Sequence, residues 1–387
     1  MKRWLASIHR TIDVTSKDSE MHKIFLTCIF IVLAGCDLDA TRSGSSAVIY
    51  SDIRPDEYVV FFRTAAWLDK VNQEWHVPIH GWVYEYDDSA ARKALFSAIL
   101  KNEYDLAPDD LTRANFTRRF NLIIADNERG KRIVVDIAGR TYAMPASAEN
   151  GQFETTLIIP AADIDRNAVG NVIRYSAVTA ESEVRAFAGE TLLLDSNGLS
   201  IISDIDDTVK ISNVNDRRSL LENTFLLDFS AVPGMSKLYN EWSAKGASLH
   251  FVSSSPWQLY SPLQEFLDEN QFAWSTLSLK SIRFRDETLL NLFKKGTETK
   301  PAAIEKILDA FSDRKFVLVG DSGEHDPEVY AALMRKFPKQ ILMVYIRNVT
   351  QESEDSERFS TVFENIRKSR WQLFDDPTAV TGLALPE

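Results

Sequence analysis

The stretch LSIISDIDDT, residues 199–208, decides the fold of the second half of this chain. Its apolar residues predict a buried β-strand, and three carboxylates follow the strand at Asp204, Asp206 and Asp207. Ionised carboxylates this close together repel one another, so the arrangement indicates a bound cation or a shared proton. The alternative is a helix cap followed by solvated acids, since Asp and Thr are common caps.

Strands and helices alternate after this stretch. The predicted strands are 199–205, 247–253, 275–280, 315–320 and 341–347, and the predicted helices are 235–245, 258–270, 301–311 and 328–337. This alternation predicts an α/β fold with a doubly wound parallel sheet, in a domain that spans residues 196–370. In such sheets the ligand crevice lies at the carboxyl ends of the strands.

Polar residues suited to phosphoryl chemistry occupy three of the strand ends and one helix start. Ser253 and Ser254 follow the second strand, and their hydroxyls can hydrogen-bond phosphoryl oxygens. Lys300 opens a helix, while Asp321 ends the fourth strand and Asp326 follows it. Each residue alone has a structural explanation, as a turn, a solvated helix end or a cap, but together they indicate one site.

The order of these motifs resembles the motif set of the haloacid dehalogenase superfamily. It runs Asp-x-Asp-x-Thr, Ser, Lys and Gly-Asp-x-x-x-x-Asp. Longer runs are similar to the catalytic domain of the actin-patch-protein type of phosphatidate phosphatase. They are DIDDTVK at 204–210, HFVSSSPWQLY at 250–260, GDSGEHDPEVY at 320–330 and IRNV at 346–349. The resemblance covers residues 196–365 and implies a haloacid dehalogenase-like fold.

The resemblance also implies the roles of the site residues. Asp204 would be the nucleophile and form an aspartyl-phosphate. Asp206 would protonate the leaving oxygen and then deprotonate water, for which it must begin protonated. Thr208 would orient Asp206. The expected phosphoryl-binding residues are Lys300 and Ser253, with Ser254 nearly as good a candidate as Ser253.

A Mg²⁺ cofactor is implied in the same way, because this hard ion prefers oxygen ligands and binds phosphates. The expected ligands are Asp204, the backbone carbonyl of Asp206, Asp321 and Asp326.

Little room is left for a cap over the site, because residues 208–252 and 253–300 are short and largely filled by the expected elements. An open site suits bulky or membrane-embedded substrates. Trp257, Leu259 and Tyr260 could form an apolar lip for acyl chains or the buried face of a helix, and the sequence leaves both readings open.

Residues 51–195 predict a small all-β, sandwich-like domain. The predicted strands are 59–62, 80–86, 122–125, 133–137, 153–159, 184–187 and 191–194, with a helical insert at 90–102. His76 and His80 have a metal-like spacing, but no further ligands accompany them, so packing is the preferred explanation.

The amino terminus predicts a bacterial lipoprotein. A short apolar stretch from Ile24 ends in LAGC at 33–36, which resembles a lipobox and makes Cys36 the lipidated first residue of the mature chain. Residues 1–35 are then a signal peptide, with Met21 as an alternative start because the residues before it include acids. Residues 36–50 form the anchor and tether, and 371–387 a tail. The resemblance to lipoproteins of the enterobacterial type implies that Asp37 favours retention at the inner membrane, on its periplasmic side.

The net charge of −12 excludes a nucleic-acid partner, since phosphate contacts need a basic face. Three functions remain. The first is a Mg²⁺-dependent phosphatase that converts phosphatidate to diacylglycerol at the membrane. The second has the same chemistry on soluble or envelope phosphoesters, and the third is a non-catalytic envelope lipoprotein. The sequence leaves the oligomeric state open.

Overall fold

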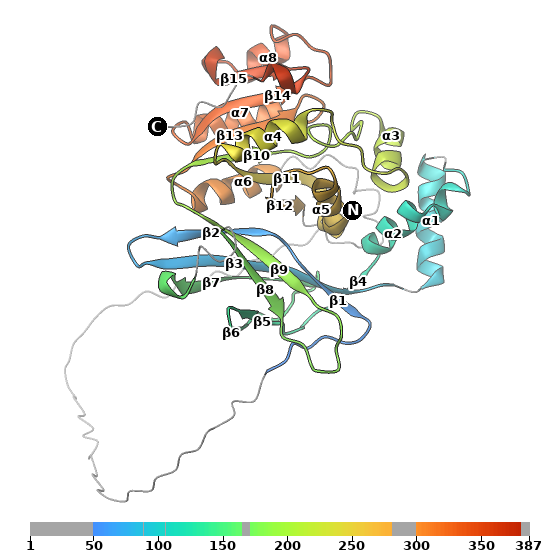
Figure 1. The fold of residues 1–387 in the computed structure, drawn as a ribbon. Coiled ribbons are helices and arrows are strands. Elements are labelled where there is room, and N and C mark those ends of the chain that lie inside the picture. Colours follow the sequence, from blue (N-terminus) through green and yellow to red (C-terminus); the bar gives the residue numbers. More distant parts are fainter. Residues whose placement is uncertain (1–48, 88, 105, 165–170, 281–298, 381–387) are drawn as a thin grey trace, which may run out of the picture. The chain divides into compact units, whose positions relative to one another are not determined.

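The carboxyl-terminal half of the chain forms a six-stranded parallel sheet, called sheet B, in this computed structural model (Figure 1). The structure describes residues 49–87, 89–104, 106–164, 171–280 and 299–380. The strand order is β12-β11-β10-β13-β14-β15, and every neighbouring pair is parallel. The strands are β10 (Leu199–Ser203), β11 (Ser248–Pro256), β12 (Ser275–Lys280), β13 (Lys315–Asp321), β14 (Ile341–Arg347) and β15 (Trp371–Phe374).

Helices cover both faces of sheet B. The helices of this half of the chain are α3 (Arg217–Leu221), α4 (Met235–Ala244), α5 (Tyr260–Glu269), α6 (Thr299–Ala310), α7 (Asp326–Lys336) and α8 (Glu357–Val362). Neighbouring residues of a strand point to opposite faces. Ile201 packs in the cluster that contains Tyr239 of α4, whereas Ile202 packs in the cluster that contains Ile304 of α6. The predicted doubly wound sheet is therefore confirmed.

The chain changes direction across sheet B at β10. It passes from β10 to β11 and β12 on one side and then returns to β13 on the other side. The carboxyl end of β10 is therefore the topological switch point, which is where ligands bind in open α/β sheets.

The amino-terminal half forms a mixed nine-stranded sheet, called sheet A. Its strands are β1 (Glu57–Phe61), β2 (Thr64–Asp69), β3 (Glu74–Glu85), β4 (Asp126–Asn127), β5 (Val134–Ile137), β6 (Arg140–Ala143), β7 (Gln152–Pro160), β8 (Val172–Ala177) and β9 (Ala188–Leu194). The long strand β3 pairs with β1, β2, β4 and β7, and among the described strands of sheet A only β2 and β9 pair in parallel. The helical insert expected at 90–102 is α1 (Ala90–Tyr104), and a second helix that the sequence did not predict, α2 (Ala114–Ile123), follows it.

Two predicted strands are wrong. Residues 122–125 are the end of α2 and the turn after it, and 184–187 form no strand. Phe116, Phe120 and Ile123 lie at helical spacing and are all buried, so a short apolar run at a helix end was mistaken for a strand. β15 also adds residues to sheet B that the sequence alone assigns to the tail.

Both sheets lie in one compact unit, Val48–Glu387. None of the described helices is long and apolar enough to cross a membrane. Cys36, Met21 and the predicted signal peptide lie outside the described residues.

Candidate active site at the carboxyl end of β10

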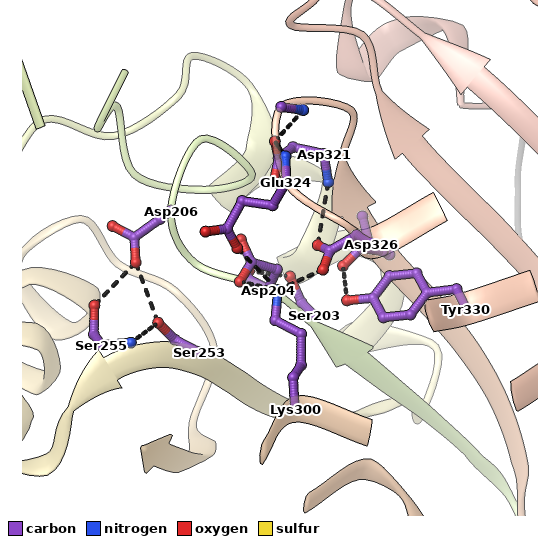
Figure 2. A network of polar contacts seen from close by, with 12 residues as sticks. Ser203, Asp204, Asp206, Ser253, Ser255, Lys300, Asp321, Glu324, Asp326 and Tyr330 are labelled. Atoms are coloured by element: carbon purple, nitrogen blue, oxygen red, sulfur yellow. Dashed lines mark hydrogen bonds and ion pairs between the residues drawn. The ribbon is translucent and has the colours of Figure 1, made fainter. Parts of the chain in front are cut away.

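Asp204 directly follows β10, and its side chain is fully buried. Its backbone N–H donates to the carbonyl of Val319 on β13, which fixes the residue between two neighbouring strands. Oδ1 accepts a 2.8 Å hydrogen bond from Lys300 Nζ, but Oδ2 has no partner among the described residues (Figure 2). A buried oxygen without a partner is unfavourable unless a ligand meets it, so Oδ2 is the atom placed to meet one.

Lys300 lies in the first turn of α6 and is buried among carboxylates. Its Nζ is 2.8 Å from Asp204 Oδ1, 2.5 Å from Asp326 Oδ1 and 3.4 Å from Glu324 Oε2. We call these four residues the Lys300 cluster. Burial lowers the pKa of Lys300, but Asp204 and Asp326 outweigh it and hold this pKa well above its ordinary value. The ammonium is therefore a fixed positive charge beside Asp204, suited to neutralise a phosphoryl group.

Three carboxylates around this ammonium could hold a divalent cation. One oxygen each of Asp204, Asp321 and Glu324 lies within 4.8 Å of the others. Asp321 Oδ1 accepts from the backbone N–H groups of Gly323 and Glu324, while its Oδ2 is buried without a partner among the described residues. Burial and neighbouring carboxylates raise the pKa of Asp204, Asp321 and Glu324, although Lys300 opposes the rise.

This donor set fits Mg²⁺. All the donors are oxygens, Oδ2 of Asp321 is buried without a partner among the described residues, and the negative charge of the three carboxylates exceeds the single charge of Lys300. Glu324 was not among the ligands expected from the sequence. Asp321 Oδ1 accepts from the backbone N–H of Glu324, and this turn places the Glu324 carboxylate beside Asp204 and Asp321. Residue spacing does not reveal a turn of this kind.

Asp326 takes a different place from the one expected. Its Oδ1 contacts Lys300, and its Oδ2 accepts a long, 3.4 Å bond from the backbone N–H of Asp321. It is not one of the three carboxylates that could share a cation. A Cβ on Gly320 would lie 2.2 Å from Asp326 Oδ2, so only glycine allows this close approach.

Asp206 is held in a separate group of polar side chains. Its Oδ1 lies 2.9 Å from Lys210 Nζ and accepts a 2.6 Å bond from Ser212 Oγ. Its Oδ2 accepts from Ser253 Oγ at 3.1 Å and from Ser255 Oγ at 3.0 Å. We call these five residues the Asp206 cluster. Figure 2 shows its serines Ser253 and Ser255 below Asp206 on the left of the view, with the Lys300 cluster to their right.

The Asp206 carboxyl is ionised in this structure. Burial raises its pKa, but the charge of Lys210 and hydrogen bonds from Ser212 and Ser255 outweigh burial and lower the pKa to about 2. A buried ammonium that the motif does not reveal lies next to Asp206, so the expectation that Asp206 begins protonated stays a prediction for the substrate-bound state.

Thr208 does not orient Asp206 in this structure. Its hydroxyl is buried and has no hydrogen-bond partner within the described part of the chain. Lys210, Ser212 and Ser255 do the orienting instead, and none of the three was expected. Asp207, the third acid of the motif, shapes the loop: its carboxylate accepts three backbone N–H bonds, and its φ is 55°.

The two serine candidates differ in their surroundings. Ser253 is buried, donates to Asp206 and accepts from the backbone N–H of Ser255. Ser254 is half-buried, and its side chain has no hydrogen bond with any described residue. The geometry therefore leaves Ser254 free to meet a ligand, while both residues stay predictions as phosphoryl-binding groups.

The apolar residues after β11 do not form a lip. Trp257, Leu259 and Tyr260 are 2%, 1% and 3% exposed and belong to the core that also contains Phe266. The alternative reading of these residues as a buried helix face is confirmed.

Residues 199–348 match the family described as phosphatidate phosphatase APP1, catalytic domain. This region resembles the catalytic domain of APP1-type phosphatidate phosphatases. The match confirms the resemblance and supports the prediction of an enzyme. Phosphatidate phosphatase APP1 of Saccharomyces cerevisiae is 35% identical over 162 residues, which are 41% of this chain and 27% of the yeast protein.

An uncharacterised protein of Schizosaccharomyces pombe is 33% identical over 183 residues, 46% of this chain and 30% of that protein. The chain thus spans less than a third of the length of these two relatives. Among solved structures, a D,D-heptose bisphosphate phosphatase from B. bronchiseptica complexed with magnesium and phosphate is similar over 47% of this chain and 94% of its own, at 12% identity and a TM-score of 0.28. A putative beta-phosphoglucomutase from Thermotoga maritima is similar over 46% and 94%, at 12% identity and a TM-score of 0.29.

Proposed function

We propose that this chain hydrolyses phosphomonoesters by transferring the phosphoryl group to Asp204, and that phosphatidate is its substrate. The observation that carries the proposal is the unpartnered Oδ2 of Asp204, which is buried beside the Lys300 ammonium in an APP1-type domain. The choice of phosphatidate is supported by the name of the yeast relative.

In the first step, Oδ2 of Asp204 attacks phosphorus, and the bond between phosphorus and the leaving oxygen breaks. Lys300 neutralises charge on the transferring oxygens. Asp206 gives a proton to the leaving oxygen. Because it is ionised without substrate, it must first gain that proton, and the negative charge of an arriving phosphate raises its pKa in the required direction.

In the second step, Asp206 takes a proton from water, and the water oxygen attacks phosphorus and releases the Asp204 carboxylate. Lys210 and the serines of the Asp206 cluster keep the carboxyl in one orientation for both transfers. Asp204, Asp321 and Glu324 would hold the Mg²⁺ ion, which when bound neutralises charge so that a phosphate dianion can approach a carboxylate.

A substrate panel tests this proposal. The purified protein is given phosphatidate in mixed micelles, glycerol phosphate or p-nitrophenyl phosphate, with Mg²⁺ or with chelator. We expect Mg²⁺-dependent phosphate release, with the highest kcat/KM on phosphatidate, and none from Asp204→Asn. Phosphate release from the soluble esters alone would show that phosphatidate is not the substrate and would favour soluble or envelope phosphoesters instead. No release from any ester would favour the non-catalytic lipoprotein.

We also propose that Cys36 carries the lipid anchor that holds the chain on the periplasmic side of a bacterial inner membrane. The support is the LAGC run that closes a short apolar stretch. Mass spectrometry of the purified protein should show an acylated amino-terminal Cys36, and Cys36→Ser should stay unprocessed. Unmodified Cys36 in wild-type protein from the soluble fraction would contradict the anchor.

A further inference from the structure

A cavity of about 450 Å³ lies between sheet A and sheet B. Ala65 of β2 lines it from sheet A, and Leu279 of β12 and Ala310 of α6 line it from the other side. Its walls include the aromatic side chains Trp67 and Phe311, whose ring centroids are 6.1 Å apart. Its size and its apolar walls are those of small-molecule sites in other proteins.

The cavity approaches the catalytic end of sheet B along α6, where Ala303 lines it about one helical turn from Lys300. Leu279 pairs with Ser253 of the Asp206 cluster, and the wall continues along β12 to Thr276. The opposite wall follows α6, whose first turn carries Lys300. A molecule with one end at Asp204 could therefore extend along this path between β12 and α6.

Charged side chains at the cavity are already paired. Arg63 is bonded to Glu190 and Asp268, and Lys306 is bonded to Glu154. Burial is the largest influence on His80 and lowers its pKa, so the imidazole is neutral at pH 7. Within the described residues, this lining presents no unpaired charge to a ligand, so the expected occupant is uncharged and apolar.

We propose that the cavity binds the hydrocarbon chain of a lipid phosphate whose phosphate group lies at Asp204. This inference rests on the proposed function and extends it, because it makes sheet A part of the substrate site. Small phosphoesters would use Asp204 and Lys300 without the cavity, whereas a long chain would bury its methylenes against Trp67 and Ala310.

Filling the cavity from either wall tests the proposal. Ala310→Leu and Ala65→Leu add methyl groups to opposite walls, and exposed Ala302→Leu on α6 is the matched control. Binding of a pyrene-labelled dodecanol is measured by fluorescence, without any turnover. We expect each cavity variant to weaken this binding about tenfold, since one methylene in an apolar pocket changes affinity by about that much or more. The control should bind like wild type.

Kinetics give the second readout. The ratio of KM for long-chain phosphatidate to KM for p-nitrophenyl phosphate should rise about tenfold in Ala310→Leu and Ala65→Leu and stay constant in Ala302→Leu. Equal probe affinity in wild type and both folded cavity variants would overturn the proposal. Probe binding that is lost in the variants, in a protein that hydrolyses no ester, would support the cavity and reject the proposed function.

Discussion

Asp204 and Asp206 are two residues apart and both are buried, yet their surroundings shift their pKa values in opposite directions. Around Asp204, burial and neighbouring carboxylates outweigh Lys300 and raise the pKa. Around Asp206, burial is outweighed by Lys210 and by hydroxyl hydrogen bonds, such as that from Ser212, which lower the pKa to about 2. The number of carboxylates around each ammonium differs: Lys300 contacts three, whereas Lys210 contacts one.

This contrast separates two chemical tasks. The Lys300 cluster has surplus negative charge and an unpartnered oxygen, as suits the cation and the phosphate of the proposed function. The Asp206 cluster is balanced and fully hydrogen-bonded at its carboxyl, as suits a group that must hold one orientation while it moves a proton. Carboxyl groups whose pKa values are pushed apart are a common mark of divided catalytic roles.

The largest expected effect is on turnover. Asp204→Asn should lower kcat by about 10⁴-fold, because the amide cannot act as the nucleophile. Its free energy of unfolding in the absence of Mg²⁺ should not fall, since the change removes one of several repelling carboxylates while Lys300 keeps Asp326. Steady-state kinetics and urea unfolding check both parts. Turnover of Asp204→Asn near the wild-type value would show that Asp204 is not the nucleophile.

Asp206→Asn should lower the free energy of unfolding more, and kcat less, than Asp204→Asn does. It leaves the buried Lys210 ammonium without its carboxylate, so unfolding should become easier by about 3 kcal/mol, with a loss in kcat of about 10²-fold. Asp163→Asn is the matched control, because its partner Arg140 is well exposed and such a pair contributes at most about 1 kcal/mol. Equal destabilisation by the two substitutions would show that the Asp206 cluster is not balanced as described.

Single substitutions can separate Ser255, which bonds to Asp206, from Ser254, a candidate for binding the phosphoryl group. Ser255→Ala removes a hydrogen bond to Asp206, and loss of that bond raises the pKa of the carboxyl. The acid limb of the pH–rate profile should therefore move to higher pH. Ser254→Ala should leave the profile in place and raise KM about fivefold, if its hydroxyl binds the phosphoryl group. Identical profiles for Ser255→Ala and wild type would remove Ser255 from this role.

The smallest expected effect is a coupling between pH, Mg²⁺ and stability. The folded-state pKa values of Asp204 and Asp321 are raised above 3.8, so the unfolded chain loses these protons first. In chelator, stability should therefore fall as pH rises above 3.8 and through the raised values. With Mg²⁺ the fall should be smaller, because the cation favours the ionised carboxylates. Parallel melting curves in chelator and Mg²⁺ across this pH range would contradict the cation site.

Much of the fold could be predicted from the sequence because the strands of sheet B are continuous apolar runs that end in polar motifs. Asp204, Lys300 and Asp321 were identified in this way, and the structure brings all three together. The end of α2 was not, since a short apolar run at a helix end has no clear period.

The Asp206 cluster could not be predicted, because it depends on local backbone irregularities. A register shift between Ser253 and Pro256 turns Ser255 toward Asp206. The left-handed backbone of Asp207 folds the loop so that Lys210 returns to Asp206. Residue spacing records neither feature, so the sequence pointed to Thr208 as the orienting residue instead.

Trapping the covalent intermediate tests directly whether Asp204 is the nucleophile. The protein is mixed with a radiolabelled phosphomonoester and Mg²⁺, quenched in acid within the first turnover, and digested for peptide mapping. We expect label on the peptide that contains Asp204, and hydroxylamine should release it because the label is an acyl phosphate. Asp204→Asn should carry no label. Turnover by wild-type protein without labelled Asp204, or label on another residue, would contradict it.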